Sequence, residues 1–451
     1  MQLLCKTLFV HPKLFTFLTI CLSTLSLPAL AQDNTGIEKE AIDVIWLATA
    51  SALVFLMQAG FALLESGMSR AKNCINVVMK NYLDLCLGSL VFFLVGYGLM
   101  FGINDSGWFG TSHFAMYKVA SWDYSFLLFQ TMFAATAVTI ASGAMAERTL
   151  FRGYLWGAVV ITGLIYPVFG SWAWGSFYQG SGWLAELGFI DFAGSSVVHS
   201  VGGWCALAAI MVLGPRLGRF SNKGEVRDIP GHNLNFVALG GLILWFGWFG
   251  FNGGSTTSAD VSIGLINLNT QLAAASGAVG ALIAGKLYGN RTLVTSIING
   301  SLAGLVGITA GCSSMEPIFA IVTGLSAGII AYAADCTMRK MRLDDVVGAV
   351  SVHGVAGAWG TLCAGLFFAE DMFNPAIIMV QLIGIIACFI WTFGTAFVTF
   401  TFIHKLGKLR VSSIDEQRGL DFAEHSEIAY PEFSFKTAYS KDALDAINKQ
   451  R

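Results

Sequence analysis

The chain contains few charged residues. Only 12% of its 451 residues are Asp, Glu, Lys or Arg, whereas a soluble domain carries about 25%. Hydrophobic residues make up 55% of the chain, and the 51 glycines fit helices that pack closely in lipid. This composition excludes an ordinary soluble domain and predicts an all-α protein that crosses the lipid bilayer many times. The net charge of −2 gives no sign of a nucleic-acid partner.

Spacings typical of metal, redox and catalytic sites are also absent from the sequence. Of the nine cysteines, Cys5 and Cys21 precede residue 32, and the other seven are scattered without a CxxC pair. We interpret those seven as small packing residues. The sequence therefore predicts no metal and no cofactor, and it offers no constellation for a membrane enzyme. The segment after about residue 407 is too short for a kinase or cyclase domain.

The N-terminus is typical of a secretory signal peptide over residues 1–31. A basic start is followed by an apolar run over 14–27 and by Ala29-Leu30-Ala31, a small-residue cleavage site. The alternative is a retained first helix, but this run is short for a membrane span. Cleavage would leave residues 32–40 as a periplasmic N-terminus.

Apolar runs predict eleven membrane spans within a transmembrane domain over residues 41–406. The predicted spans are approximately 41–64, 74–101, 124–146, 152–171, 194–214, 234–253, 264–288, 293–312, 317–335, 346–369 and 376–404. Lys and Arg concentrate in the loops after odd-numbered spans, whereas the loops after even-numbered spans hold only Lys118. By the positive-inside rule the N-terminus lies outside, and residues 407–451 form a cytoplasmic tail.

One motif occurs twice, once in each half of the chain. It reads Asp191-x2-Gly194-x3-Val198-His199-x3-Gly203 and then Asp345-x2-Gly348-x3-Val352-His353-x3-Gly357. The fifth span enters from outside and the tenth from inside, so spans one to five and six to ten are predicted to be inverted repeats. Many transporters build a site where such repeats meet. The eleventh span is predicted to pack across the others.

The repeated motif places one histidine deep in each half of the membrane domain. Ionisable side chains inside a membrane are costly and mark functional sites by default. Two facing imidazoles can pass a proton, since each ring both donates and accepts a hydrogen bond. The alternatives are a pair of satisfied core histidines and, less compatible with the small neighbouring residues, haem ligation.

The two aspartates begin the same spans. Asp191 is suited to cap its helix and also to stabilise a cation at the outer mouth, with capping alone as the alternative. Asp345, close to several basic residues, is predicted to be structural. Trp174 and Trp248 fall near the outer face, where an aromatic face can hold a cation, although aromatic belts and packing explain most membrane aromatics.

Several segments resemble the ammonium transporter (Amt/Mep/Rh) family. They include the run from Asp191 to His199 and on to Gly214-Pro215-Arg216, and also Met57 to Gly67. Others are Phe129-Gln130-x2-Phe133, Gly247 to Ser255, and Asp345-x7-His353-Gly354. The similarity covers roughly residues 40–425 in order. In the first two spans, Phe61 to Lys80 and Asp84 resemble the Amt branch that is also seen in plants.

The resemblance implies a homotrimer with a separate pore in each subunit. It implies an outer site for ammonium or methylammonium at Phe129, Trp174 and Ser255, supported by Asp191. Phe133 and Phe251 would form a gate with Trp248 below the mouth, and His199 with His353 would form a proton relay. Ammonium would bind, lose its proton and cross as ammonia at the inner membrane of a bacterium. An alternative is an ammonium sensor that signals through a PII-type protein bound to the tail.

Overall fold

A computed structural model describes residues 35–117, 119–223, 225–407 and 409–433. The predicted signal peptide and the end of the predicted tail lie outside these residues. The chain divides into a unit that ends at Ala41 and a second unit that begins at Ile42. Everything below concerns the second unit, which holds all the predicted site residues.

The described residues are helical apart from loops and three isolated bridges. The longer helices in the first half of the chain are α2 (Thr35–Met68), α3 (Cys74–Val91), α5 (Ser121–Ala144), α6 (Phe151–Val160), α7 (Tyr166–Trp174) and α9 (Val201–Leu213). Those in the second half are α10 (Leu234–Gly254), α11 (Ile263–Leu287), α12 (Val294–Ile308), α13 (Pro317–Lys340), α14 (Ala356–Leu366) and α15 (Pro375–Lys405). Short elements join or extend them: η1 (Ala71–Asn73), η2 (Phe92–Gly96), α4 (Tyr97–Phe101), η3 (Ile161–Ile165), α8 (Trp183–Glu186), η4 (Ser195–Ser200), η5 (Val350–Val355), α16 (Ser413–Arg418), α17 (Leu420–His425) and η6 (Pro431–Phe433).

Every predicted span contains helix, which confirms an all-α membrane protein. Among the described residues, eight helical segments are long and apolar enough to cross a membrane, and two shorter apolar helices cover 294–308 and 350–366. The count of eleven spans therefore stays a prediction. The predicted fourth span ended at residue 171, whereas the helix continues to Trp174, which is thus its last residue and not part of a loop.

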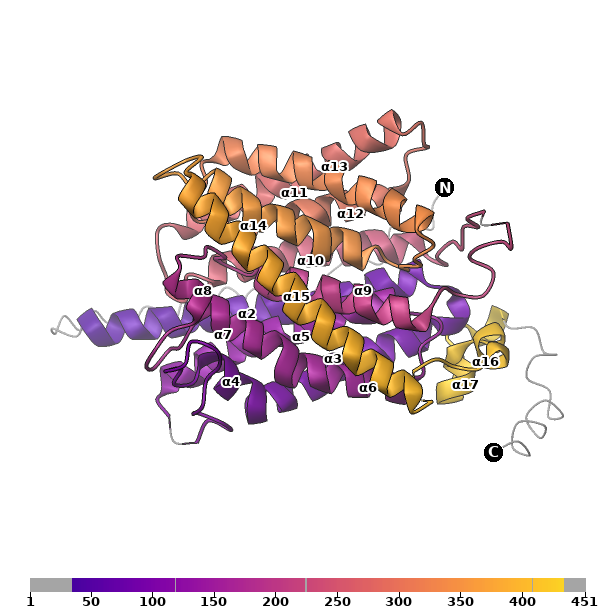
Figure 1. The fold of residues 1–451 in the computed structure, drawn as a ribbon, viewed down its shortest axis with the longest axis horizontal. Helices are drawn as coiled ribbons and strands as arrows, with labels where there is room; N and C mark the ends of the chain where they lie inside the picture. The colour runs from indigo at the N-terminus through magenta and orange to yellow at the C-terminus, as the bar shows by residue number, and fades with distance from the viewer. Residues whose placement is uncertain (1–34, 118, 224, 408, 434–451) are drawn as a thin grey trace, which may run out of the picture. The chain divides into compact units, whose positions relative to one another are not determined.

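Helix α15 crosses the other helices obliquely in Figure 1. It packs against α6, α7 and α9 from the first half of the chain and against α14 from the second. Helix α15 therefore contacts both halves of the chain, as expected if the predicted eleventh span packs across the others.

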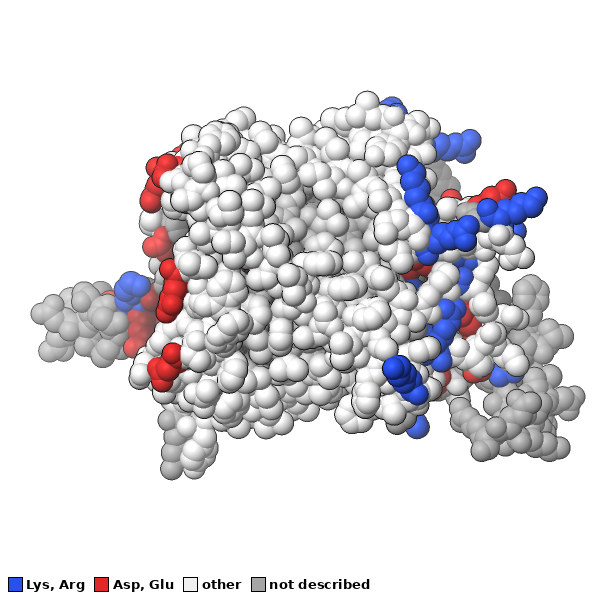
Figure 2. Space-filling view, viewed as in Figure 1, with Lys and Arg blue, Asp and Glu red and all other residues white. Residues whose placement is uncertain are grey.

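Charged side chains lie at two opposite ends of the face shown in Figure 2. Most of the Lys and Arg lie at one end, with some Asp and Glu among them, while the other end shows mainly Asp and Glu, and an uncharged belt lies between the two ends. The end rich in Lys and Arg is also the end where α16 and α17 lie (Figures 1 and 2). An uncharged belt of this kind fits contact with the hydrocarbon core of a bilayer, because charged groups there would lose their hydration.

Candidate functional site

The two repeated histidines meet inside the protein. Nδ1 of His199 lies 3.2 Å from Nδ1 of His353, and the two rings are stacked with their centroids 5.3 Å apart. Both residues are buried, at 0% and 6% exposure. One ring must donate and the other accept in this contact, so the pair holds at least one proton between its nitrogens. The geometry is that of a hydrogen-bonded pair of imidazoles buried in the protein.

Each histidine sits on a short π-helical segment. His199 lies on η4 and His353 on η5, and each segment leads directly into an α-helix, α9 or α14. Such wide turns are rare and frequently occur at functional sites. The repeated sequence motif therefore produces a repeated and unusual backbone conformation.

The glycines of the motif allow the two segments to cross in close contact. A Cβ atom on Gly203 would lie 2.2 Å from the backbone N of Gly354, and one on Gly357 would lie 2.4 Å from the carbonyl oxygen of Ser195. Neither distance is possible for a real Cβ. The last glycine of each motif thus packs on the backbone of the other repeat and brings the two histidines together.

The aspartates of the motif cap these same segments. The carboxylate of Asp191 accepts hydrogen bonds from four backbone N–H groups, at residues 194–197, over 2.7–3.0 Å. Asp345 accepts from three, at Val347, Gly348 and Val350. Gly194 and Gly348, with φ of +108° and +81°, supply the left-handed turn between each aspartate and its helix. The capping role expected of Asp191 is present in the structure, and Asp345, expected to be structural, caps its segment in the same way.

Burial changes the acidity of Asp191, which lies between α7 and η4 and outside the spans. Burial raises the pKa of this carboxyl to about 6, although hydrogen bonds from the backbone N–H groups of Val197 and its neighbours oppose the shift. Asp191 lies beside Trp174, because its backbone carbonyl oxygen accepts a 2.7 Å hydrogen bond from Trp174 Nε1.

Aromatic rings form a continuous row that leads to the histidines. The ring of Phe129 lies 4.6 Å from that of Phe133, which stacks at 4.0 Å on Phe251. The ring of Phe251 then lies 5.3 Å from that of His199. These rings are all buried. The stacked pair of phenylalanines therefore stands between the outer residues and the imidazoles, where the resemblance implies a gate.

The remaining predicted residues lie along the same row. Trp248 stacks on His199 at 4.9 Å and donates its indole N–H to Thr309 over 2.9 Å. The ring of Trp174 lies 6.3 Å from that of Phe133. Ser255 donates a hydrogen bond to the carbonyl oxygen of Phe251 over 2.8 Å, and both Trp174 and Ser255 are half-buried. The structure thus brings all nine predicted site residues into one connected group.

Three residues near this group were not predicted from the sequence. Thr309 fixes the indole of Trp248, and the ring of Phe61 lies 6.3 Å from that of His353. Glu65 lines a cavity together with His353. Only Glu65 carries a signal that would have singled it out, namely an acidic residue inside an apolar run.

Comparison with known proteins agrees with this geometry. The sequence model of the ammonium transporter family matches residues 45–430. The chain belongs to the ammonium transporter family. Ammonium transporter Amt2 of Archaeoglobus fulgidus is 45% identical to it over 87% of this chain and 89% of its own length. Ammonium transporter 1 member 3 of Solanum lycopersicum is 36% identical over 87% and 93%.

Solved structures of this family show the same fold. A structure described as a sensor Amt protein superposes with a TM-score of 0.83 at 42% identity, covering 86% of this chain and 99% of the other. Mep2 of Candida albicans gives a TM-score of 0.77 at 30% identity, covering 87% and 92%. Membership of this family assigns the chain to multi-pass membrane transporters and not to enzymes.

A network of ion pairs joins the loops at the end rich in Lys and Arg. Arg216 pairs with Glu147 at 2.9 Å and with Asp344 at 2.8 Å, and all three side chains are almost fully buried. Burial alone would raise the pKa of Asp344, but its hydrogen bonds and ion pairs with Arg216 and Arg148 outweigh burial and lower it below its usual value. The ionised carboxylate of Asp344 therefore stabilises the fold at neutral pH. This stabilisation is lost as the pH falls below the ordinary Asp pKa of about 4.

The tail packs against the same loops. Arg410 forms a 2.8 Å ion pair with Glu416, whose carboxylate also accepts from the backbone N–H of Leu217. Asp421 accepts a 2.8 Å hydrogen bond from the backbone N–H of Asn76 near the start of α3. The described part of the tail is thus fastened to the loop after α9 and to the start of α3.

Proposed function

We propose that the chain carries out ammonium uptake across the inner membrane. Ammonium binds at Phe129, Trp174 and Ser255 with Asp191 in support, loses a proton, and crosses as ammonia past Phe133, Phe251 and Trp248. The proton follows through His199 and His353. The observation that carries this proposal is the 3.2 Å contact between two buried imidazoles at the end of a row of buried rings.

The physical argument rests on the cost of moving a bare ion. A full charge in an apolar passage loses its hydration, which costs many kcal/mol. Potassium is nearly the same size as ammonium, so a size filter cannot separate the two. Only ammonium can give up a proton, and a route in which ammonia and the proton move separately is selective for that reason.

Uptake of labelled methylammonium tests this function. Cells that lack their own ammonium transporters are expected to accumulate the label when they express this chain, and excess ammonium is expected to compete. Expression that reaches the membrane without any uptake would contradict transport. Such an outcome would favour the second candidate function, an ammonium sensor, which is supported by the 42% identity to a structure described as a sensor Amt protein.

The proposed topology has eleven spans in two inverted repeats of five and one packing helix. It places the N-terminus in the periplasm after removal of residues 1–31, the transmembrane domain over 41–406, and the tail over 407–451 in the cytoplasm. The segregation of Lys and Arg at the end that carries α16 and α17 supports this orientation. Labelling of single cysteines introduced at residue 36 and at residue 414 from outside intact cells tests it.

We also propose that the protein is a homotrimer. Many apolar side chains on α10, α11 and α15 are exposed in a single subunit, for example Leu242, Leu268 and Ile390, and they must be covered by lipid or by other subunits. Native mass spectrometry of the protein in lipid nanodiscs is expected to give the mass of three chains.

Removal of the tail, residues 407–451, is predicted to alter regulation and to preserve the outer binding site. The contacts of Arg410 and Asp421 are with Glu416 of the tail itself and with the start of α3, and neither involves a residue of the proposed outer site. Binding of methylammonium is expected to stay within about twofold of the full chain. Binding of a PII-type protein, measured by co-sedimentation with proteoliposomes, is expected to be lost. Loss of trimer assembly would instead show that the tail is structural.

A further inference from the structure

A cluster of buried charged residues lies beside the row of pore residues and has no part in the function proposed above. It consists of Glu65 on α2 and of Lys80 and Asp84 on α3, and none of these residues is more than 1% exposed. Ionisable side chains at such positions in a membrane protein are expensive and call for an explanation.

The cluster is held by hydrogen bonds from three helices. Glu65 accepts a 2.9 Å hydrogen bond from Asn81 Nδ2, and the hydroxyl of Tyr154 donates to the carboxylate of Asp84 over 2.6 Å. Lys80 donates to the carbonyl oxygen of Ser142 over 3.2 Å and lies 5.2 Å from the centroid of the Tyr154 ring. The positions of all three charged groups are therefore fixed.

The charges in this cluster do not balance when every group is ionised. Two carboxylates face one ammonium group, which leaves one negative charge in excess inside the protein. An uncompensated buried charge costs several kcal/mol. The cluster is therefore neutral when its two carboxyl groups together hold one proton, which makes it a group that can release a proton and take one up.

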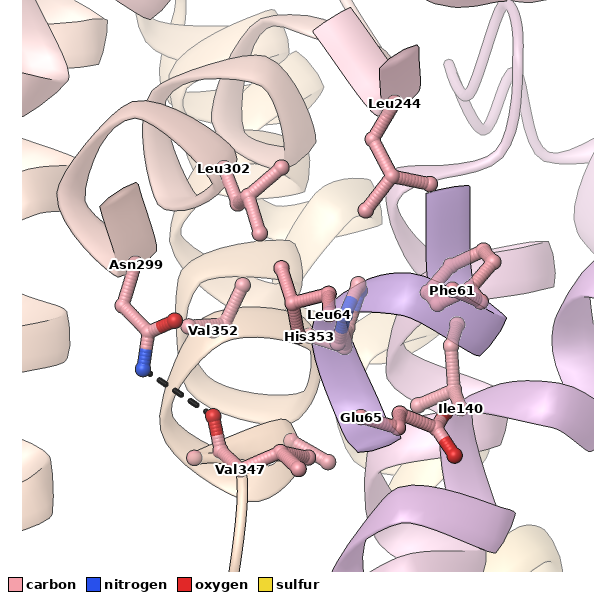
Figure 3. A pocket seen from close by; sticks show the side chains of 12 residues that line it. Phe61, Leu64, Glu65, Ile140, Leu244, Asn299, Leu302, Val347, Val352 and His353 are labelled. Atoms are coloured by element: carbon pink, nitrogen blue, oxygen red, sulfur yellow. Dashed lines mark hydrogen bonds between the residues drawn. The ribbon is translucent and has the colours of Figure 1, made fainter. Parts of the chain in front are cut away.

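Glu65 connects this cluster to the histidine pair. Figure 3 shows Glu65 and His353 lining the same cavity from different helices. The cavity has a volume of ≈ 20 Å³, which is enough for one water molecule between polar partners. A water in this position would connect the imidazole to the carboxyl group by hydrogen bonds.

The same cavity adjoins a larger one on the side away from the outer residues. Asn299, Val347, Gly348 and Val352 line both cavities, and the larger has a volume of ≈ 340 Å³. Arg216, Arg219 and Arg339 line only the larger one. The first two lie in the loop after α9 and Arg339 lies in the last turn of α13, and the proposed topology places both segments at the cytoplasmic side. Glu65 and His353 line only the small cavity, and the four shared residues place that cavity next to the larger one.

We propose that Glu65 is the next proton carrier after His353. The proposal rests on the proposed function, because it needs a proton that reaches His353. Protonated Glu65 releases its proton to water in the small cavity, which breaks its O–H bond, and the proton passes on to water in the adjoining larger cavity. The carboxylate then takes a proton from His353 through one water, so that a new O–H bond forms as an N–H bond breaks. Nothing is oxidised or reduced, and one proton leaves for each proton that enters.

The test is the variant Glu65→Gln, which keeps the size of the side chain and removes its ability to ionise. In proteoliposomes, the charge moved per methylammonium taken up is expected to fall about tenfold or more, because a proton carrier contributes at least that factor to a transfer step. The uptake itself is expected to stay within about twofold. Glu65→Asp, which restores a carboxyl group, is expected to recover most of the charge movement.

Glu147→Gln is the matched control. It makes the same change at another buried carboxyl group, which lines neither cavity, and the ratio of charge to uptake is expected to be unchanged. An unchanged ratio in Glu65→Gln would overturn the proposal. An equal fall in both Gln variants would also overturn it, because buried carboxyl groups would then matter only for structure.

A second measurement applies to the wild-type protein, in case Glu65→Gln does not fold. Infrared difference spectra recorded on addition of ammonium are expected to show a change in the C=O band of a protonated carboxyl group. Spectra without such a change would contradict the proposal. A different variant tests the proposed function itself. If that function is wrong, a protein in which both His199 and His353 are replaced by Ala still carries the ammonium-driven current.

Discussion

Replacement of both His199 and His353 by Ala is expected to abolish the selective current that ammonium drives through proteoliposomes. The two rings are the only imidazoles in the row of buried rings, and their nitrogens lie 3.2 Å apart. Without them, no imidazole lies between Phe251 and the cavity that Glu65 lines, so a proton that ammonium leaves at the outer site loses its path to Glu65. We expect the current to fall by about 100-fold or more, as when a general acid or base is removed from a proton transfer.

The control for this experiment is His232→Ala. This histidine contacts the carbonyl oxygen of Ser69 and the hydroxyl of Tyr430, away from the row of rings. Its replacement is expected to preserve the current. A selective current in the double variant of His199 and His353 would show that the relay is wrong, and a current carried also by potassium would show that the histidines act as a filter instead.

Replacement of Asp191 by Ala is expected to remove both the outer binding site and a large part of the stability of the protein. Four backbone N–H groups at the start of η4 would lose their acceptor inside the protein. A buried donor without a partner costs about 1–3 kcal/mol, and a typical N-cap contributes about 1 kcal/mol. We expect a loss of about 4 kcal/mol in the free energy of unfolding, visible as a lower midpoint of thermal unfolding in detergent.

The repeat provides the control for this prediction. Asp345→Ala removes the equivalent cap in the other half, where three N–H groups are involved and the side chain is half-buried. It is expected to lower the midpoint less and to preserve methylammonium binding. Asp191→Asn keeps an acceptor oxygen for the cap but loses the charge. If methylammonium still binds to Asp191→Asn but not to Asp191→Ala, Asp191 acts on binding only through its capping hydrogen bonds.

The repeated motif allowed much of the site to be predicted from the sequence. Its spacing placed His199 and His353 at equivalent positions, and its aspartates and glycines predicted capping and close packing. These features follow from local chemistry: an aspartate accepts N–H groups at a helix start, and a glycine allows two backbones to touch.

Other features depend on contacts between distant segments and have no local pattern. The π-helical form of η4 and η5 occurs where the two copies of the motif meet, and the spacing within the motif does not predict it. The partnership of Trp248 with Thr309 joins α10 to the end of α12. The continuation of α7 to Trp174 needs the tertiary hydrogen bond to Asp191. The role of Glu65 depends on a cavity that residues of five helical segments, α2, α5, α10, α12 and η5, line together.

The reciprocal contacts of Gly203 and Gly357 restrict how the two halves of the chain can move. Many transporters with inverted repeats alternate between two states by tilting one repeat against the other. Here the backbones touch at both glycines, so a tilt at this crossing would drive atoms already in contact into each other. In the function proposed above, the gate would then open and close by rotation of single side chains, Phe133 and Phe251. The protein would pass its cargo through a fixed frame, with small and fast changes in place of a large conformational cycle.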